Sequence, residues 1–165
     1  MEDYSIKSNI PILSTVYSPP IIDDQVTIRD FDKIALLGIG AFGSVHLVKN
    51  KKTKHPYAMK ILKKEYIKKK VTGTLTECKI LMQADHPFIS SLYFCFQTEL
   101  NLYIIMQYCA GGDFYNVIQR QPDKCLTIQQ TQFYSACVLL ALEYLHTNGI
   151  IYRDLKPENI LMRVS

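Results

Sequence analysis

The most constraining feature of this sequence is the string Tyr-Arg-Asp-Leu-Lys-Pro-Glu-Asn at residues 152–159. Pro157 disfavours helical backbone at Lys156, so the string predicts a rigid loop that carries polar groups inward. A carboxylate such as Asp154 can accept a hydroxyl proton, an ammonium can neutralise a phosphate oxygen, and the amide oxygen of Asn159 can bind magnesium. A polar surface loop would explain the acid and the amide alone. The whole string instead favours a site for phosphoryl transfer to an alcohol.

A glycine-rich string, Gly-Ile-Gly-Ala-Phe-Gly-Ser at residues 38–44, lies between two short β-type runs, Phe31–Leu37 and Val45–Val48. In a dinucleotide-binding fold a helix would follow the glycines, whereas residues 44–48 alternate like a strand. Strand, glycine loop and strand would let the backbone approach phosphate oxygens closely, because glycine has no Cβ. Taken alone, the string could also form a plain hairpin that has a glycine-rich turn.

A third strand is predicted at residues 57–62, with Tyr57, Met59 and Ile61 on one face and Ala58, Lys60 and Leu62 on the other. A lone lysine in an apolar strand is usually an edge residue whose ammonium reaches solvent. Residues 92–96 and 102–106 give two further strands. Apolar residues at helical spacing predict a helix over Val71–Ala84. The result is a small antiparallel sheet with one helix.

The second half of the sequence predicts helices. A short helix is expected over Asp113–Arg120. Thr127 and Gln130 form a capping-box pattern that opens a long helix, and Gly149 is its natural stop. Its apolar stripe predicts core packing and consists of Ile128, Phe133, Cys137, Leu140, Ala141, Tyr144 and Leu145.

Together these strings resemble the eukaryotic protein kinases from about Phe31 to Met162. Lys156-Pro157 matches the serine/threonine form of the loop, and Tyr152 in place of His is the variant common in the AGC group. Two further strings, Gln-Pro-Asp-Lys-Cys-Leu at residues 121–126 and Leu-Glu-Tyr-Leu-His, are similar to one AGC branch. That branch holds plant phototropin-like kinases and related fungal kinases acting in membrane-lipid asymmetry and polarity.

The resemblance implies an α+β, protein-kinase-like fold in which a five-stranded antiparallel N-lobe precedes the first helices of a C-lobe. Its implied divisions are a disordered leader at 1–30, an N-lobe at 31–106, a hinge at 107–113 and the start of a C-lobe at 114–165.

The resemblance also implies ATP and Mg²⁺ as cofactors, and roles for single residues. Asp154 would accept the substrate hydroxyl proton, Lys156 would steady the γ-phosphate, and Asn159 would bind magnesium. Lys60 would hold the α- and β-phosphates while paired with Glu77. The residues implied around ATP are Leu37, Gly38, Ile39, Gly40, Ala41, Phe42, Gly43, Ser44, Val45, Ala58, Lys60, Glu77, Met106, Gln107, Cys109, Asp113 and Leu161. Within that set, the Gln107 carbonyl and Cys109 amide would pair with the adenine edge, and Asp113 would meet the ribose. At both of these positions the kinases usually have Glu, whereas this chain has Gln107 and Asp113.

In kinases an Asp-Phe-Gly or Asp-Phe-Asp segment follows the catalytic loop, and its Asp holds the principal magnesium. The present sequence ends at Ser165 without one. We therefore expect this chain alone not to be a competent serine/threonine kinase, since positioning and charge stabilisation are nearly all the catalysis available. The alternatives are a non-catalytic product that binds nucleotide or competes for partners, and a mispredicted gene.

Composition limits the classes of partner that the protein is expected to bind. The net charge is +4, and lysines crowd into residues 49–54 and 63–70. An ordinary solvated face explains these runs, although peripheral contact with an anionic membrane is also open. No aromatic residues interleave with the lysines, so no nucleic-acid partner is expected. Five cysteines without a Cys-x-x-Cys pair, and no apolar signal segment at Met1, predict a cytoplasmic protein. We expect a monomer that takes ATP and a protein substrate.

Overall fold

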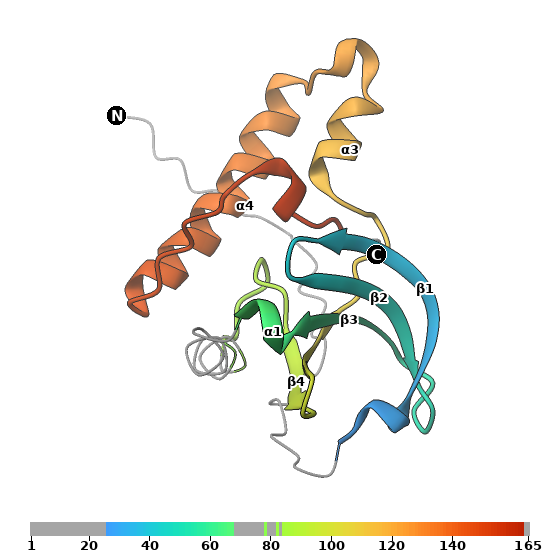
Figure 1. The fold of residues 1–165 in the computed structure, drawn as a ribbon. Helices are drawn as coiled ribbons and strands as arrows, with labels where there is room; N and C mark the ends of the chain where they lie inside the picture. The colour runs from blue at the N-terminus through green and yellow to red at the C-terminus, as the bar shows by residue number, and fades with distance from the viewer. Residues whose placement is uncertain (1–25, 68–77, 79–81, 83, 164–165) are drawn as a thin grey trace.

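The computed structural model describes residues 26–67, 78, 82 and 84–163. A twisted five-stranded antiparallel sheet of order β1-β2-β3-β5-β4 lies at one end, and helices α3 and α4 lie at the other (Figure 1). The predicted α+β architecture is confirmed. The strands are β1 (Phe31–Gly40), β2 (Gly43–Asn50), β3 (Pro56–Lys63), β4 (Leu92–Gln97) and β5 (Asn101–Gln107). The helical elements are η1 (Ile28–Asp30), α1 (Lys64–Ile67), α3 (Phe114–Gln119), η2 (Pro122–Lys124), α4 (Ile128–Thr147) and η3 (Pro157–Asn159).

The glycine string belongs to the sheet rather than to a separate loop. Gly38, Ile39 and Gly40 pair with Val45, Ser44 and Gly43, so that only two residues, Ala41 and Phe42, form the turn. The sequence predicted strands that ended at residue 37 and resumed at residue 45. Backbone pairing continues past these limits because it needs no side chains, and glycines pair as other residues do.

Alternation along β3 places a core on each face of the sheet. Leu62 packs into a cluster with Leu102 and Ile104, whereas Met59 packs on the opposite face. Tyr57 and Ile61 border the Met59 cluster, so the predicted division of β3 into two faces is confirmed. The first cluster is completed by Ile67, Cys78, Met82 and Leu92, and the second by Phe31, Val48, Tyr103 and Ile105.

The helix predicted over residues 71–84 lies largely outside the described residues. Cys78 and Met82 are described, and both are helical and buried, at 3% exposure each. Their spacing of four residues matches one helical face. Helix α1 was not predicted, because its four residues fall in a lysine-rich run; it buries Ile67 in the first core cluster.

The disordered leader predicted at residues 1–30 wrongly includes a short ordered turn. Residues 28–30 form the helical turn η1, which the capping box of Thr27 and Asp30 closes. Val26 and Ile28 pack against the second core cluster. This turn escapes a periodicity search because three residues do not complete a helical period.

Helix α4 begins and ends where the sequence predicts. The Thr127 hydroxyl accepts the Gln130 amide, and the Gln130 side chain accepts the Thr127 amide. At the other end Gly149 has φ +73°, its amide donates to the His146 carbonyl, and the Ile150 amide donates to the Leu145 carbonyl. These two bonds form a Schellman stop.

The predicted core stripe of α4 is only partly confirmed. Leu145 is buried, and Cys137, Ala141 and Tyr144 are half-buried. Ile128 and Phe133 are instead 74% and 59% exposed. Tyr134, which the stripe omits, packs towards α3, with its ring 4.7 Å from that of Phe114. Apolar residues occur on several sides of this helix, so their spacing alone does not select the packed side.

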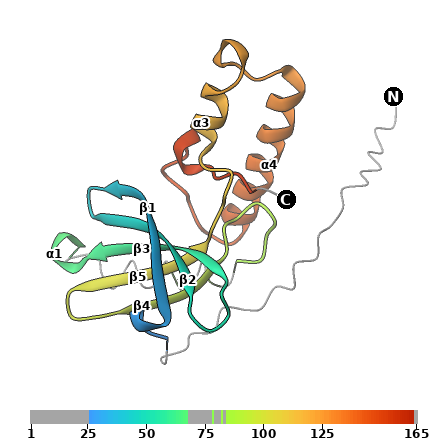
Figure 2. The same ribbon diagram turned by 90° about the vertical axis from the view of Figure 1, so that its right-hand side faces the viewer.

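The two ends of the molecule are joined at several places. Figure 2 shows α3 and α4 standing at one end of the sheet, and the segment after α4 running between α4 and the sheet. The Tyr144 hydroxyl of α4 accepts the Asp85 amide at 3.0 Å. The ring of Tyr144 also lies 5.1 Å from that of His86. No helix in the described part of the chain is both long enough and apolar enough to cross a membrane.

Candidate active site

One face of the sheet gathers several of the predicted site residues. Val45 and Lys60 are direct cross-strand partners, as are Ala58 and Met106. Side chains two residues apart on a strand point to the same face, so these four residues share it. Ala58 is buried and Lys60 is exposed, which gives a small apolar surface beside an ammonium group. Leu47, the other partner of Ala58, lies on the same face and was not predicted, because the strand pattern alone does not indicate which face a ligand uses.

The glycines of the hairpin differ in how much space surrounds them. A Cβ at Gly43 would overlap the Ile61 carbonyl oxygen and lie 2.9 Å from its carbon. Packing within the sheet therefore requires glycine there. A Cβ at Gly38 or Gly40 would meet nothing within 4 Å. The open space above these two residues fits a backbone that receives a phosphate chain from outside the protein.

Ser44 faces away from this surface. Its hydroxyl lies 2.9 Å from the His46 Nε2 atom, and both residues alternate with Val45 on β2. Burial, helped by the nearby charge of Lys33, lowers the pKa of His46. Only the backbone of Ser44 is therefore placed to serve the Lys60 face.

Asp154, Lys156 and Asn159 are in direct contact in the segment after α4. The Lys156 Nζ lies 3.0 Å from the Asp154 Oδ1. Asn159 donates from Nδ2 to the Asp154 carbonyl oxygen and to its Oδ2, each at 2.8 Å. Pro157 occupies the first turn of η3, where its fixed φ suits the bend that returns Asn159 to Asp154.

The charges of Asp154 and Lys156 stabilise each other. The hydrogen bonds from Lys156 and Asn159 lower the pKa of Asp154, and the Asp154 carboxylate raises the pKa of Lys156. Burial raises the pKa of the nearby Tyr152 phenol. Asp154 is consequently an ionised acceptor at neutral pH, next to a permanent cation.

The segment after β5 places Cys109 half-buried, and burial raises the pKa of its thiol. Asp113 caps α3, accepting the Asn116 amide at 2.8 Å and the Asn116 Nδ2 at 2.6 Å. These hydrogen bonds lower the pKa of Asp113. The predicted ribose contact would therefore use the same carboxylate that caps α3. The capping role is consistent with the sequence prediction, in which the helix begins at Asp113.

A short backbone ladder, not predicted from the sequence, joins this segment to the end of the catalytic loop. The Gly111 amide donates to the Met162 carbonyl at 2.9 Å, and the Met162 amide donates to the Gly112 carbonyl at 2.8 Å. Asp113 and Leu161 pair between these bonds. A Cβ at Gly111 would lie 2.6 Å from the Met162 carbonyl oxygen, so only glycine fits there. Leu161 is thereby held against the segment that follows β5.

The remaining predicted residues are less constrained. Leu37 lies at an irregularity in the β1–β2 pairing, Ile39 is 81% exposed, and Phe42 at the turn is 54% exposed. Gln107 ends β5, where its amide donates to the Ser91 carbonyl at 2.9 Å. Glu77 lies outside the described residues.

The donor groups suit magnesium only when phosphate oxygens complete the set. Among the described residues, no cluster of three or more His, Cys, Asp and Glu side chains could hold a metal ion. Magnesium in phosphoryl-transfer sites is commonly bound by one or two carboxylates together with substrate phosphates. The Asn159 amide oxygen can join such a set, because Asn159 contacts Asp154 through Nδ2 alone.

Comparison with known proteins gives a single family. Residues 31–165 match the family described as protein kinase domain. The chain is 52% identical over 143 residues to the serine/threonine-protein kinase nrc-2 of Neurospora crassa, covering 86% of this chain and 23% of that protein. It is 48% identical over 151 residues to flippase kinase 1 of Saccharomyces cerevisiae, covering 90% and 17%. It is 45% identical over 141 residues to the serine/threonine-protein kinase AGC1-7 of Arabidopsis thaliana, covering 84% and 25%.

These relatives are fungal and plant kinases, as the sequence resemblance predicted. The chain spans a quarter or less of the length of each of the three.

Proposed function

Because the chain belongs to the protein kinase domain family, we propose that it forms the nucleotide-binding lobe and catalytic loop of a serine/threonine protein kinase. The observation that carries this proposal is the contact of Asp154 with both Lys156 and Asn159. An acceptor, a cation and an amide meet within one loop, which is the set that phosphoryl transfer to an alcohol needs.

ATP with Mg²⁺ supplies the phosphoryl group when bound. The Lys60 ammonium and the open backbone at Gly38 and Gly40 would hold its phosphates. The shared face of Val45, Ala58 and Met106 would hold the adenine, with Leu161 opposite and the backbone of Gln107 and Cys109 along its edge. The remaining implied residues, Leu37, Ile39, Ala41, Phe42, Gly43 and Ser44, would contribute through the hairpin, and Asp113 would reach the ribose.

Asp154 would accept the proton of a serine or threonine hydroxyl at its free carboxylate lone pairs. Its depressed pKa keeps it ionised, so it is ready to accept a proton but binds one weakly. General-base assistance of this kind typically contributes ~10²–10⁴-fold in rate. Lys156, at 3.0 Å, would offset negative charge that develops beside Asp154.

The experiment that tests this proposal is ATP titration of the 165-residue chain by calorimetry, with and without Mg²⁺. Lys60→Met is the test variant. Lys63→Met is the matched control, because Lys63 lies on the same strand, is exposed and points to the other face. We expect saturable Mg²⁺-dependent binding that Lys60→Met abolishes and Lys63→Met leaves intact. Equal binding by all three proteins would contradict the proposed nucleotide site.

Phosphoryl transfer separates the kinase from the alternative, a non-catalytic product that binds nucleotide. Incubation with labelled ATP and a serine peptide, alongside Asp154→Asn, measures turnover directly. ATP binding without transfer would favour the alternative for this chain. The expectation that the chain alone does not turn over, its monomeric state, its cytoplasmic location and contact of a lysine-rich face with membranes all stay predictions.

A further inference from the structure

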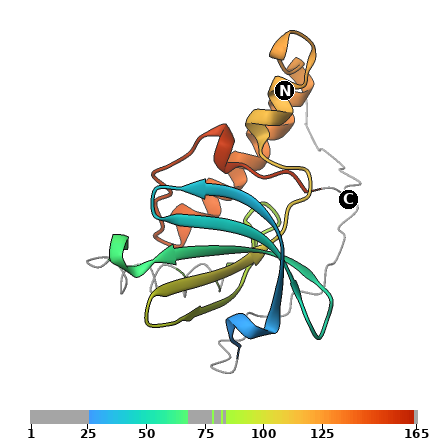
Figure 3. The same ribbon diagram turned by 45° about the vertical axis from the view of Figure 1, so that its right-hand side comes forward.

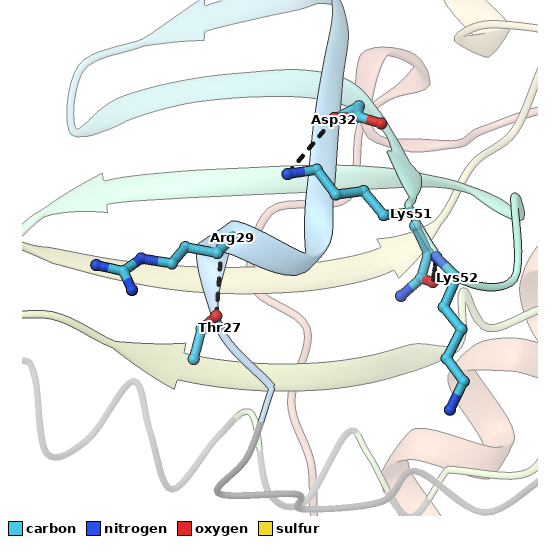
Figure 4. Close-up of polar contacts among 6 residues, drawn as sticks. Thr27, Arg29, Asp32, Lys51 and Lys52 are labelled. Atoms are coloured by element: carbon cyan, nitrogen blue, oxygen red, sulfur yellow. Dashed lines mark hydrogen bonds and ion pairs between the residues drawn. The ribbon is translucent and has the colours of Figure 1, made fainter.

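Positive charge gathers at the end of the sheet that lies farthest from α3 and α4. Lys49 at the end of β2 and Lys51, Lys52 and Lys54 of the β2–β3 turn are all exposed. Arg29 of η1 belongs to the same end, because the Lys51 amide donates to the Asp30 carbonyl at 2.8 Å. Figure 3 shows η1 and the β2–β3 turn side by side at this end, and Figure 4 shows Arg29, Lys51 and Lys52 there. We call these five residues the basic end.

Two carboxylates, Asp30 and Asp32, lie beside the five cations of the basic end, so that three positive charges remain in excess. The Asp30 carboxylate accepts the Thr27 amide at 2.7 Å and the Thr27 hydroxyl at 3.0 Å, so it is engaged in the cap. Asp32 pairs with Lys51 at 3.7 Å, and both side chains are more than half exposed (Figure 4). An exposed pair at this distance binds weakly. Within the described residues, the other four cations of the basic end form no ion pair.

Hydrogen bonds fix the backbone of the turn. The Asn50 Oδ1 accepts the Lys52 and Thr53 amides, each at 2.9 Å. The Lys54 amide donates to the Asn50 carbonyl, and the His55 amide donates to the Thr53 hydroxyl. These amides are therefore not available to wrap a single phosphate group, and a ligand meets side-chain ammonium groups on a rigid turn. Such a surface suits a broad layer of negative charge better than a compact anion.

The neighbouring aromatic rings argue against single-stranded nucleic acid as the partner. The Tyr57 ring lies 4.8 Å from His55 and 5.1 Å from Tyr93, and it also contacts Phe31 and Phe94. These rings pack on one another. Binding of single-stranded nucleic acid relies on exposed rings on which bases stack.

We propose that the basic end binds the surface of an anionic lipid bilayer. Strand β2 spans eight residues, about 25 Å at a rise of ~3.3 Å per residue, and it separates the basic end from the glycine hairpin. The electrostatic reach of a charged membrane is ~8 Å at physiological salt. Docking through the basic end therefore leaves the glycine hairpin outside the membrane field. The contact does not depend on the proposed kinase function.

The test is co-sedimentation of the 165-residue chain with vesicles of phosphatidylcholine alone or mixed with phosphatidylserine. The test variant is Lys52→Gln with Lys54→Gln. The control is Arg120→Gln with Lys124→Gln, which removes the same charge from exposed positions outside both lysine runs. Each lysine near an anionic surface is worth about fivefold in partition, so the test variant should bind about 25-fold more weakly. The control should bind as the unsubstituted chain does, and added salt should weaken every partition that depends on phosphatidylserine.

Two results would overturn the proposal. One is an equal loss in both double variants, which would mean that net charge alone attracts the vesicles. The other is binding of a single-stranded RNA more tightly than of the vesicles, lost in the same test variant. ATP titration of the same samples keeps this contact separate from the proposed nucleotide site. Neither Lys52 nor Lys54 belongs to that site, so both double variants should retain ATP binding.

Discussion

At the scale of single residues, the catalytic loop shows how far a local string determines its own geometry. The bend that Pro157 favours returns Asn159 to Asp154, five residues earlier in the chain. The contact of Asp154 with Lys156 and Asn159 was therefore predictable from eight consecutive residues. The cap made by Asp113 was predictable in the same way, since its partner Asn116 is three residues away.

The first prediction concerns the acidity of Asp154. Hydrogen bonds from Lys156 and Asn159 stabilise its ionised form and hold its pKa below the ordinary 3.8. Their contribution to loop stability is therefore present above pH 3.8 and is lost as the pH falls through the lower folded-state value. Asn159→Ala should raise the pKa of Asp154 towards 3.8, as followed by carboxyl NMR titration. An unchanged pKa in Asn159→Ala would contradict the contact.

The second prediction separates two glycines of one hairpin. Gly43→Ala should cost ~1–3 kcal/mol of unfolding free energy, because its Cβ would overlap the Ile61 carbonyl oxygen. Gly40→Ala should change stability by less than ~0.5 kcal/mol, since nothing lies within 4 Å of its added Cβ. It should nevertheless weaken ATP binding, because the methyl group fills the space proposed for phosphates. Urea denaturation and ATP titration of both variants measure the contrast, which fails if both lose stability equally.

At the scale of elements, the sequence predicted features that depend on neighbouring residues and missed features that depend on residues far apart in the chain. The ends of α4 were predictable because Thr127, Gln130 and Gly149 act on the backbone within one turn. The packed side of α4 was not predictable, because it is selected by Phe114 and Ile160 from other segments. The ladder between Gly111 and Met162 was also missed, because no local pattern specifies a pairing across fifty residues of chain.

The third prediction tests that ladder. Gly111→Ala places a methyl group against the Met162 backbone and should displace the neighbouring Leu161. Gly112→Ala is the matched control: it meets no atom within 4 Å but has φ +76°, so it costs ~1–2 kcal/mol of backbone strain. We expect Gly111→Ala to weaken ATP binding more than Gly112→Ala does at comparable loss of stability. Calorimetric titration beside thermal denaturation distinguishes the two effects, and equal affinities would exclude a positioning role for the ladder.

At the scale of the whole molecule, the two halves differ in how completely they are packed. The sheet has a buried cluster on each face, with Met59, Leu102, Ile105 and Val48 fully buried. Helix α4 instead leaves large apolar side chains exposed, Leu139 at 67% among them. The spacing of apolar residues predicted the sheet correctly, because β3 and β5 bury residues on both of their faces. For α4 it was only partly correct, because burial there depends on which other segments pack against the helix.

The fourth prediction follows from this difference in packing. Leu145→Ala should lower the free energy of unfolding by ~2–5 kcal/mol, because Leu145 is only 7% exposed and its truncation leaves a cavity. Leu139→Ala, six residues earlier on the same helix, should change it by less than ~0.5 kcal/mol, since its side chain already contacts water. Both substitutions keep helix propensity favourable, so the comparison isolates burial. Chemical denaturation followed by circular dichroism measures both values. A cost at Leu139 as large as that at Leu145 would mean that this face of α4 is covered in solution, and the exposed stripe would then be a buried interface.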